Sequence, residues 1–554
     1  MQIRSIALSH KLAKESPINK PSLLQLILIK YQSFTDLCIS LYMIIVIVVL
    51  PFYYTTGYYG IATAKEAVFM LSCRILLPLL LAEGGLFLLV LLLGDGTLKE
   101  KGILLFKKLS TTDRFALLYV LALLLSFAFT NYKEEALWGA DGWQMGFLPQ
   151  LMLAASYFKI AHAWKLKLWL PLLLLPTSMV QFLFACMNRF GLYPVPMDGA
   201  NPLFIAFIGN INWYCGYMVT ILFGVVYFLW AEYPCRKWRG FLYCYLFLGF
   251  ASLITQGSFS GIFTFVACML LLLFLSAFYG RNLNSLLLVL MIFCIACCGV
   301  SLLCSLFPQT VTYPEGIPSL LTASSFPWIA SVFLMILLLA IRKWSDKAFF
   351  SKILRFFSLI FLFLIAMSGI IFLALLVKNT LSPGSIGFLS RYSVFTFTPE
   401  WGSKRGATWR AGFLCFAEQP LLKKLIGIGP DCMGIYTLQD AGLPIKELLQ
   451  AQFSGLTLTN THNEWLTILL NLGILGLCGF MGMTGSACFR FFCCGIKGHG
   501  KYSHFIGACG MCVFAYTVHN LFSFQQITNV TLLFLLLGIG ENCRKAEESP
   551  SPSP

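Results

Sequence analysis

Long runs of apolar residues recur along nearly the whole chain, and they limit its fold more strongly than any other feature. They produce a composition that is 58% hydrophobic and 11% charged over 554 residues, which no soluble globular class shows. We read fourteen runs as membrane spans, at residues 34–54, 67–93, 114–131, 143–161, 167–187, 211–231, 239–256, 259–279, 284–307, 324–341, 354–377, 465–487, 503–523 and 527–540. The prediction is an all-α fold, a polytopic transmembrane helix bundle of about 14 spans.

Basic residues are distributed unevenly between the predicted loops. With the N-terminus in the cytoplasm, 27 of the 39 Lys and Arg residues fall in cytoplasmic segments, and only Lys65, Lys133 and Arg189 fall in short loops on the other side. This is the positive-inside pattern. The net charge of +16 therefore reports orientation, and a nucleic-acid partner is excluded. We expect a multi-pass protein of the cytoplasmic (inner) membrane, with both termini cytoplasmic and no cleaved signal at the polar N-terminus.

The predicted spans divide the chain into five parts. These are a cytoplasmic N-terminal tail (1–33), a transmembrane bundle of about 11 spans (34–377), a large extracytoplasmic loop (378–464), about 3 C-terminal spans (465–540) and a disordered cytoplasmic tail (541–554). The loop is the informative part, because function in membrane proteins tends to lie in long loops.

Two short helices are predicted within this loop, both lying along the membrane surface. The first runs from near Gly406 to Pro420, and Pro444 opens the second at its first turn. The expected apolar face of the first helix consists of Trp409, Phe413, Phe416 and Ala417. Cys415 and Cys432 share the loop; a disulfide between them and two free thiols are both open.

The sequence "THNE" (Thr461–Glu464) stands directly before an apolar run. Thr461 and Glu464 have the spacing of a capping box, which predicts that Glu464 bonds back to the capping residue. His462 is expected on the first turn of the helix, whose dipole attracts anions and disfavours the imidazolium. His462 should then be neutral and able to accept a proton, although a lone interfacial histidine is often a packing detail.

Two arginines precede the first loop helix or lie within it. Arg405 and Arg410 flank Trp409. A guanidinium suits bidentate contact with a phosphate, and an indole can stack on a sugar ring. The alternative is that both arginines only contact lipid headgroups.

Two further polar clusters are expected at the same membrane depth. Asn210 and Asn212 lie in "FIGNINWYCGYM" where a span begins, and His519 lies in "YTVHNLFSF" at the end of another. Because these clusters come from distant parts of the chain, their convergence on one depth favours a shared site.

Several motifs of other enzyme classes are absent. The sequence has no GxxxxGK[ST] loop, no GxGxxG after a strand, no DxD pair and no legible Ser-His-Asp set. We predict that the chain binds no metal and no cofactor, and that any reaction draws its energy from an activated, membrane-borne substrate.

These residues resemble those of the O-antigen ligase and O-antigen polymerase superfamily of bacterial membrane glycosyltransferases. "THNEWLTILLNLGILGL" resembles the family's His-Asn-Glu helix, and "RGATWRAGFLCFAEQPLLKKLIGIGPD" its Arg-x-x-x-Trp helix and Gly-x-Gly turn. "GNINWYCGYM" and "VHNLFSF" are weaker matches. The chain departs from the family at "TQGSFSGIF", where Phe259 and Ser260 replace an arginine pattern. The expected phosphate-binding arginine is either missing or supplied from elsewhere, with Arg391, Lys404 and Arg410 as the candidates.

The resemblance implies a membrane glycosyltransferase (GT-C-like) architecture in the bacterial inner membrane. The donor would be a glycan on a polyprenyl diphosphate, and the acceptor a hydroxyl of a glycan, lipid or wall polymer, with inversion at the anomeric carbon and no metal. Carried over by residue, Arg405 and Arg410 would bind the diphosphate, and His462 with Glu464 would be catalytic. The predicted glycan or acceptor contacts are Trp409, Asn463, Asn210, Asn212 and His519.

Two other classes compete with the enzyme. A lipid-linked oligosaccharide flippase or other transporter would also have many spans, but it is expected to have short outside loops and two related halves. In a scaffold protein, clustered His, Arg and Asn would be coincidental. Within the enzyme class, ligase and polymerase differ only in the acceptor, and the sequence leaves both open.

Overall fold

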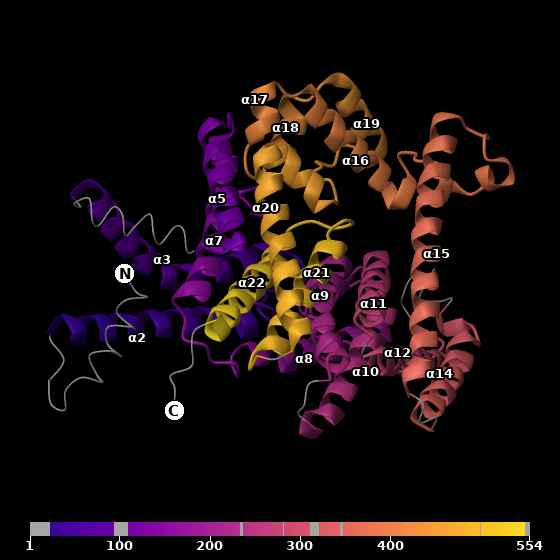
Figure 1. The fold of residues 1–554 in the computed structure, drawn as a ribbon. Helices are drawn as coiled ribbons and strands as arrows, with labels where there is room; N and C mark the ends of the chain where they lie inside the picture. Colours follow the sequence, from indigo (N-terminus) through magenta and orange to yellow (C-terminus); the bar gives the residue numbers. More distant parts are fainter. Residues whose placement is uncertain are drawn as a thin grey trace, which may run out of the picture.

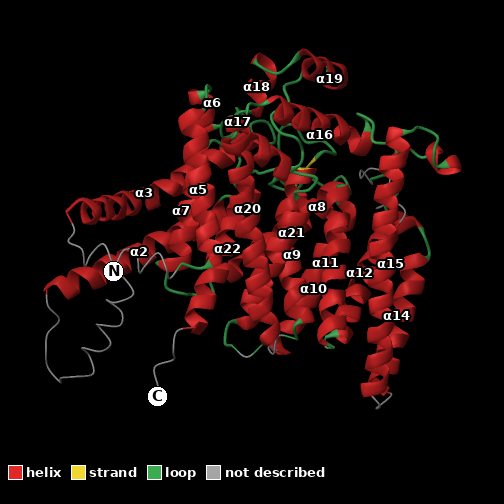
Figure 2. Ribbon diagram, turned by 45° about the horizontal axis from the view of Figure 1, so that its top comes forward, coloured by secondary structure: helices red, strands yellow, loops and turns green. Residues whose placement is uncertain are grey.

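The structure is a computed structural model, and it describes residues 23–93, 109–232, 236–280, 282–310, 321–343, 347–498 and 500–548. The predicted all-α fold is confirmed (Figure 1). In the described ranges the only strands are β1 (Phe204–Ile205) and β2 (Gly209–Asn210), an antiparallel pair (Figure 2). The predicted tail 541–554 begins inside a helix that continues to Glu548, and its remainder, like most of the tail 1–33, lies outside the described residues.

Each predicted span falls on a helix. Within the described part, nine helices are long and apolar enough to cross a membrane: α2 (Leu23–Ile44) continuing into η1 (Ile45–Val49), α3 (Ile61–Leu93), α5 (Thr111–Phe129), α8 (Leu174–Arg189) after η2 (Pro171–Leu173), α9 (Ile211–Trp230), α11 (Phe259–Tyr279), α12 (Leu283–Leu306), α15 (Lys347–Leu381) and α20 (Glu464–Lys497). The other bundle helices are α7 (Phe147–His162), α10 (Arg239–Thr255), α14 (Phe326–Lys343), α21 (Ser503–His519) and α22 (Ile527–Glu548). The number of crossings stays a prediction.

Helix α9 lies at the centre of the bundle. It is buried along almost its whole length and packs against α10, α11, α21 and α22. Helix α20 packs along α5 and α21, so the C-terminal helices close around the same core. By contrast, α14 and α15 lie at one flank, where α15 leaves its apolar side chains exposed (Figure 1). That exposure suits a helix surrounded by lipid.

Four helices cover one end of the bundle (Figure 1). They are α16 (Trp401–Glu418), α17 (Leu421–Ile426), α18 (Met433–Gln439) and α19 (Leu443–Phe453), and we call residues 401–453 the roof. The short helices η4 (Gly387–Arg391) and η5 (Ser393–Phe395) connect α15 to it, and α6 (Lys133–Trp138) lies beside it. Figure 2 shows the loops gathered beneath the roof.

The first roof helix differs from prediction in the face that it buries. Phe413 and Ala417 are exposed, whereas Ala407, Ala411 and Cys415 are buried. Small side chains are buried because α16 lies close to the segment before α20: a Cβ on Gly412 would stand 2.6 Å from Thr461. Large apolar residues on that face would hold the two elements apart.

The roof has its own small core. Cys415 and Cys432 both belong to it, as buried free thiols, so no disulfide joins them. The roof is attached to the bundle at a break in α20. Gly473 has φ +69° and ψ −170°. The break frees the carbonyls of Leu470 and Asn471, which accept hydrogen bonds from the N–H groups of Ile428 and Gly429, each at 3.1 Å.

Charged side chains tie the helices together at the end opposite the roof. Asp113 of α5 accepts hydrogen bonds from Tyr157 (2.7 Å) and contacts His162 (3.0 Å), both on α7. Glu541 of α22 is buried and forms an ion pair with Arg490 of α20. With these contacts below and the roof above, the core helices are held at both ends.

Candidate functional site

The segment before α20 does not form the predicted capping box. The helix begins at Glu464, and Asn463 is its N-cap, whose side chain accepts a hydrogen bond from the N–H of Leu466 at 3.0 Å. The hydroxyl of Thr461 is paired with that of Thr467 at 2.8 Å instead. The predicted role of Glu464 as a capping partner is therefore wrong.

Glu464 faces α21. Its backbone N–H donates to the carbonyl of Asn520 at 3.0 Å. Its carboxylate accepts hydrogen bonds from Tyr516 at 3.1 Å and from the side-chain amide of Asn520, and only 1% of the residue is exposed. A buried carboxylate needs such donors. Glu464 thus fixes the start of α20 to the end of α21, next to His462.

His462 lies one residue before the N-cap rather than on the first turn of the helix. Its φ is +52°, and its N–H donates to Asn460 Oδ1 at 3.1 Å. The ring contacts Phe524 edge to face, with centroids 5.2 Å apart, and its Nδ1 is buried without a hydrogen-bond partner among the described residues. Burial and the charge of Arg405 lower the pKa of His462 to about 4. The imidazole is neutral for these two reasons, rather than because of the helix dipole.

Arg405 reaches the same place from α16. Its Nε and Nη2 donate to the carbonyl of Phe522 at 3.3 and 3.1 Å, and Nη1 donates to Gly402 at 2.9 Å. The guanidinium lies 5.8 Å from the ring centre of Phe522. Burial lowers the pKa of Arg405. The charge of Arg405 acts on both His462 and His519, so the structure brings together three residues predicted from separate motifs.

Trp409 and Arg410 lie one turn further along α16. Trp409 stacks on Phe522, with centroids 6.0 Å apart and an interplanar angle of 26°, while its Nε1 is buried and has no partner in the described ranges. Arg410 is exposed. The two arginines therefore differ: Arg405 is partly buried and hydrogen-bonded to the carbonyl of Phe522, whereas Arg410 is exposed.

The remaining predicted contacts lie deeper. His519 is fully buried, and its Nδ1 is 2.8 Å from Asn520 Oδ1. Asn210 is the N-cap of α9, accepting from the N–H of Asn212 at 2.9 Å, and Asn212 accepts from Ser258 at 2.8 Å. His519 lies against α9, because a Cβ on Gly216 would stand 3.0 Å from its ring. Asn210 and Asn212 thus shape the end of α9.

The place of the missing family arginine is filled by aromatic packing. The ring of Phe259 contacts that of Phe522 at 6.0 Å, and Phe522 is the residue whose carbonyl Arg405 binds. Of the three candidate replacements, Arg391 is exposed and Lys404 donates to the carbonyl of Gln452. Arg410 is exposed as well, so among these residues Arg405 is the one whose guanidinium lies beside the Phe259–Phe522 pair.

Buried polar atoms without partners are concentrated around these residues. In the part of the chain that the structure describes they include Trp409 Nε1, His462 Nδ1, Asn471 Oδ1, His519 Nε2, Ser523 Oγ, Gln526 Nε2 and Asn529 Oδ1. Buried polar groups in proteins are nearly always paired. A group of unpaired atoms beside a cation and a neutral imidazole is the arrangement expected of a site that binds a polar ligand.

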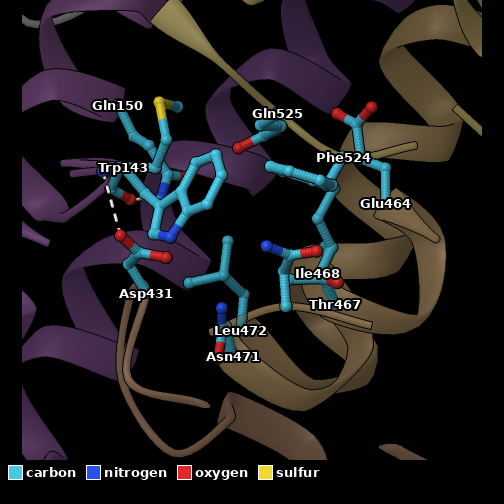
Figure 3. A pocket seen from close by; sticks show the side chains of 12 residues that line it. Trp143, Gln150, Asp431, Glu464, Thr467, Ile468, Asn471, Leu472, Phe524 and Gln525 are labelled. Atoms are coloured by element: carbon cyan, nitrogen blue, oxygen red, sulfur yellow. Dashed lines mark hydrogen bonds between the residues drawn. The ribbon is translucent and has the colours of Figure 1, made fainter. Parts of the chain in front are cut away.

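Sequence reasoning missed the acid on the other side of this region. Asp431, in the "GIGPD" turn, is buried with φ +57°, and its Oδ2 accepts hydrogen bonds from the N–H groups of Ala140 (2.8 Å) and Met145 (3.0 Å). Burial raises the pKa of Asp431 to about 7. Figure 3 shows this carboxylate at the edge of a hollow that Glu464 also lines. The sequence indicates the glycine-rich turn, but no motif marks Asp431 within it as a functional residue.

A comparison with families of known proteins matches residues 319–481 to the family described as O-antigen ligase. Residues 319–481 are thus similar in sequence to O-antigen ligase domains. The match covers less than a third of the chain but includes Arg405, Trp409, His462 and Glu464, and it confirms the resemblance to the O-antigen ligase superfamily. That superfamily indicates a ligase-like, multi-pass membrane glycosyltransferase that uses a lipid-linked glycan and a glycan acceptor. No curated protein matches the chain.

Proposed function

We propose that this O-antigen ligase domain protein transfers a glycan from a polyprenyl diphosphate to an acceptor hydroxyl at the roof end of the bundle. The observation that carries the proposal is the convergence of three residues on the segment Phe522–Phe524: Arg405 donates to the carbonyl of Phe522, Trp409 stacks on the Phe522 ring, and His462 contacts Phe524. All three residues lie within the segment that matches the family. A cation, a neutral base and an indole are the groups that a diphosphate, a reacting hydroxyl and a sugar ring require.

Arg405 binds the diphosphate and stabilises the negative charge that develops as it leaves. Its Nε and Nη2 donate to the carbonyl of Phe522. A bound phosphate would replace this neutral acceptor with an anionic one, which forms a stronger hydrogen bond. Arg410, exposed on the same helix, supplies a second cation toward the lipid surface. Stabilising developing charge in this way is often the largest single contribution to catalysis.

His462 takes the proton of the acceptor hydroxyl as that oxygen attacks the anomeric carbon. The new glycosidic bond forms while the bond to the diphosphate breaks, on the opposite face, so the configuration inverts and no metal takes part. A positioned general base contributes about 10²–10⁴ in rate. Glu464 holds the His462 segment through Tyr516 and Asn520, and we assign it a positioning role.

The surrounding polar side chains orient the glycan. Trp409 offers an aromatic face, and Asn463, Asn210, Asn212 and His519 shape the polar surface below it. The roof end faces away from the cytoplasm of the bacterial host and both termini lie inside, which the charge distribution supports. Ligase or polymerase activity then depends only on which acceptor occupies the site.

The test is release of polyprenyl diphosphate by purified protein in EDTA, using a polyprenyl-diphosphate-linked glycan and candidate acceptors. Wild type should release it and yield a longer or transferred glycan. His462→Ala and Arg405→Ala should lose about 10² or more of the rate. Lys424→Ala, which changes a roof cation given no role, is the matched control and should keep full activity. Equal turnover in all four proteins would contradict the proposal.

A further inference from the structure

We propose that two hollows on either side of Trp143 form the acceptor subsite, and that this subsite is built for a neutral, hydroxyl-rich saccharide. The ligand's role as the acceptor rests on the proposed function, whereas the binding site itself follows from its own geometry. Trp143 lies outside the segment that matches the family.

Trp143 is presented by a short loop between α6 and α7, with the sequence "GADGWQMG" (139–146). Asp431 holds both ends of this loop through the N–H groups of Ala140 and Met145. Position 139 requires glycine, because its φ is +100° and a Cβ there would stand 2.4 Å from the backbone nitrogen of Met145. The loop is therefore closed tightly at its base, and the partly exposed indole is fixed in position.

The indole borders two hollows. One, of about 430 Å³ including its mouth, is lined by Trp143, Met145, Gln150, Asp431, Asn460, Glu464, Thr467, Ile468, Asn471, Leu472, Phe524 and Gln525. Figure 3 shows Trp143 and Phe524, whose rings contact each other edge to face, lining this hollow together with Gln525. The other, of about 290 Å³, is lined by Trp143, Trp213, Gln526, Thr528 and four neighbours. Both volumes include space that is open to solvent, so each hollow is itself much smaller than these figures.

The lining has the composition that recognises a sugar. Apolar rings supply the walls, and amide side chains supply both donors and acceptors for hydroxyl groups. In the described ranges Gln526 Nε2 and Asn471 Oδ1 are buried without partners, and these residues are only 7% and 5% exposed. An unpaired donor and an unpaired acceptor suit a ligand whose groups can do both, as a hydroxyl does.

The ligand is neutral because the hollows offer it no cation. Lys65 lines the second hollow, but its Nζ already donates to the carbonyls of Leu50 (3.0 Å), Pro51 (3.1 Å) and Tyr53 (3.1 Å). An ammonium has three donors, so none is left for a phosphate. Asp431 and Glu464 in the first hollow supply oxygens that can accept hydrogen bonds from hydroxyls, and they bring no positive charge for an anion.

The subsite adjoins the proposed base. Trp143 contacts Phe524 edge to face at 5.0 Å, and Phe524 contacts His462 at 5.2 Å. Arg405, on the other hand, is bonded to Phe522. His462 thus lies next to the Trp143 hollows, with Phe524 between them, and the charge of Arg405 lowers its pKa. A base that acts between a sugar acceptor and a diphosphate donor requires this position.

The test measures binding and turnover separately. Binding is followed by equilibrium dialysis of labelled, neutral oligosaccharides released from the envelope polysaccharide of the cells that make the protein. Trp143→Ala and Trp143→Leu should each weaken this binding and raise the acceptor KM by about tenfold or more, while the donor KM is unchanged. Leucine keeps apolar volume at the site without an aromatic face, so Trp143→Leu tests the role of the ring even if Trp143→Ala destabilises the fold. Trp138→Ala, which removes a half-exposed indole on α6, is the matched control.

The outcomes separate the two proposals. Oligosaccharide binding that depends on Trp143, without polyprenyl diphosphate release by wild type, would support the saccharide site and contradict the transfer reaction. Turnover whose acceptor KM is the same in wild type and both Trp143 variants would support the transfer reaction and overturn the subsite. An acceptor that must carry a phosphate to bind at Trp143 would also overturn the proposal of a neutral ligand.

Discussion

At the residue scale, His462 owes its chemistry to its neighbours. The left-handed backbone conformation turns the imidazole toward Phe524, and Asn460 holds the backbone there. Strained conformations of this kind persist where the surroundings fix them, and they are common at functional sites. Because Arg405 is one cause of the low pKa of His462, the two residues are coupled: a change to the arginine alters the base.

The pH dependence of the free enzyme reports this coupling. The proposed base role requires His462 to be neutral. Because its pKa is about 4, kcat/KM should be flat at neutral pH and should fall as pH falls through about 4. In Arg405→Gln the acid limb should move to higher pH, because one cause of the depressed pKa is gone. An acid limb near 6.5 in the wild type, unmoved in the variant, would show that another group controls the rate.

Asp431 allows a second prediction at this scale. In Asp431→Ala the N–H groups of Ala140 and Met145 lose their acceptor, which should cost about 1–3 kcal/mol. Asp431→Asn keeps an accepting oxygen and should cost much less. Thermal unfolding in detergent measures both.

Linkage adds a pH test of the same residue. The folded-state pKa of Asp431 is raised from 3.8 to about 7. The folded protein therefore binds more protons than the unfolded chain between these values. The contribution of Asp431 to stability is full below about pH 4 and falls as pH rises to about 7. Asp431→Asn should remove this part of the slope; an unchanged slope would assign it to other groups.

At the element scale, the break in α20 is what allows the roof to sit on the bundle. Gly473 and Gly427 meet there: a Cβ on Gly473 would stand 2.4 Å from the backbone of Leu425, and one on Gly427 would stand 2.1 Å from the carbonyl of Asn471. Both glycines also have positive φ, +69° and +84°. The same contact positions Asn471 and Asp431 at the Trp143 hollows.

Gly473→Ala and Gly427→Ala should therefore destabilise the roof. The positive φ alone costs about 1–2 kcal/mol for a non-glycine residue, and the backbone clash adds to it. Limited proteolysis should cut the roof faster in both variants, and polyprenyl diphosphate release should fall with it. Gly485→Ala is the control, since nothing lies within 4 Å of a Cβ there. Equal cleavage in all three variants would contradict this account.

Elements were more predictable from sequence than the contacts between them. Hydropathy located the bundle helices, and Pro420 and Pro444 marked the roof helices correctly, because those signals are local. The cap of α20 was wrong because Thr461 pairs with Thr467 and Glu464 with α21, and neither tertiary partner is visible in a capping pattern. The buried face of α16 was wrong because close approach favoured Gly412 and its small neighbours over large apolar residues.

The candidate site was predictable in part for the same reason. Arg405, His462 and His519 come from three motifs, and a shared membrane depth was enough to group them. The hydropathy pattern makes Trp143 the first residue of an apolar span, but in the structure it belongs to a loop. Asp431, 288 positions further along the chain, holds this loop by accepting from the N–H groups of Ala140 at 2.8 Å and Met145 at 3.0 Å. Long-range hydrogen bonds of this kind leave no periodic signal.

At the scale of the whole molecule, the account requires that the roof and the opposite end lie on different sides of the membrane. In a functional background whose reactive native cysteines have been replaced, Leu456→Cys beside the roof should react with a membrane-impermeant maleimide on intact cells. Lys501→Cys, in the turn between α20 and α21, should react only after permeabilisation. Both positions are exposed. The reverse labelling pattern would place the site in the cytoplasm and contradict the proposed donor.

The central claim is that a glycosidic bond forms as the polyprenyl diphosphate leaves. The most direct measurement reconstitutes wild-type protein in proteoliposomes with lipid-linked glycan and acceptor, in EDTA, and counts both products in the same sample. The account predicts one polyprenyl diphosphate released for each glycan transferred, with neither formed by His462→Ala. Passage of intact lipid-linked glycan to the opposite leaflet, with no diphosphate released, would contradict it and identify a transporter.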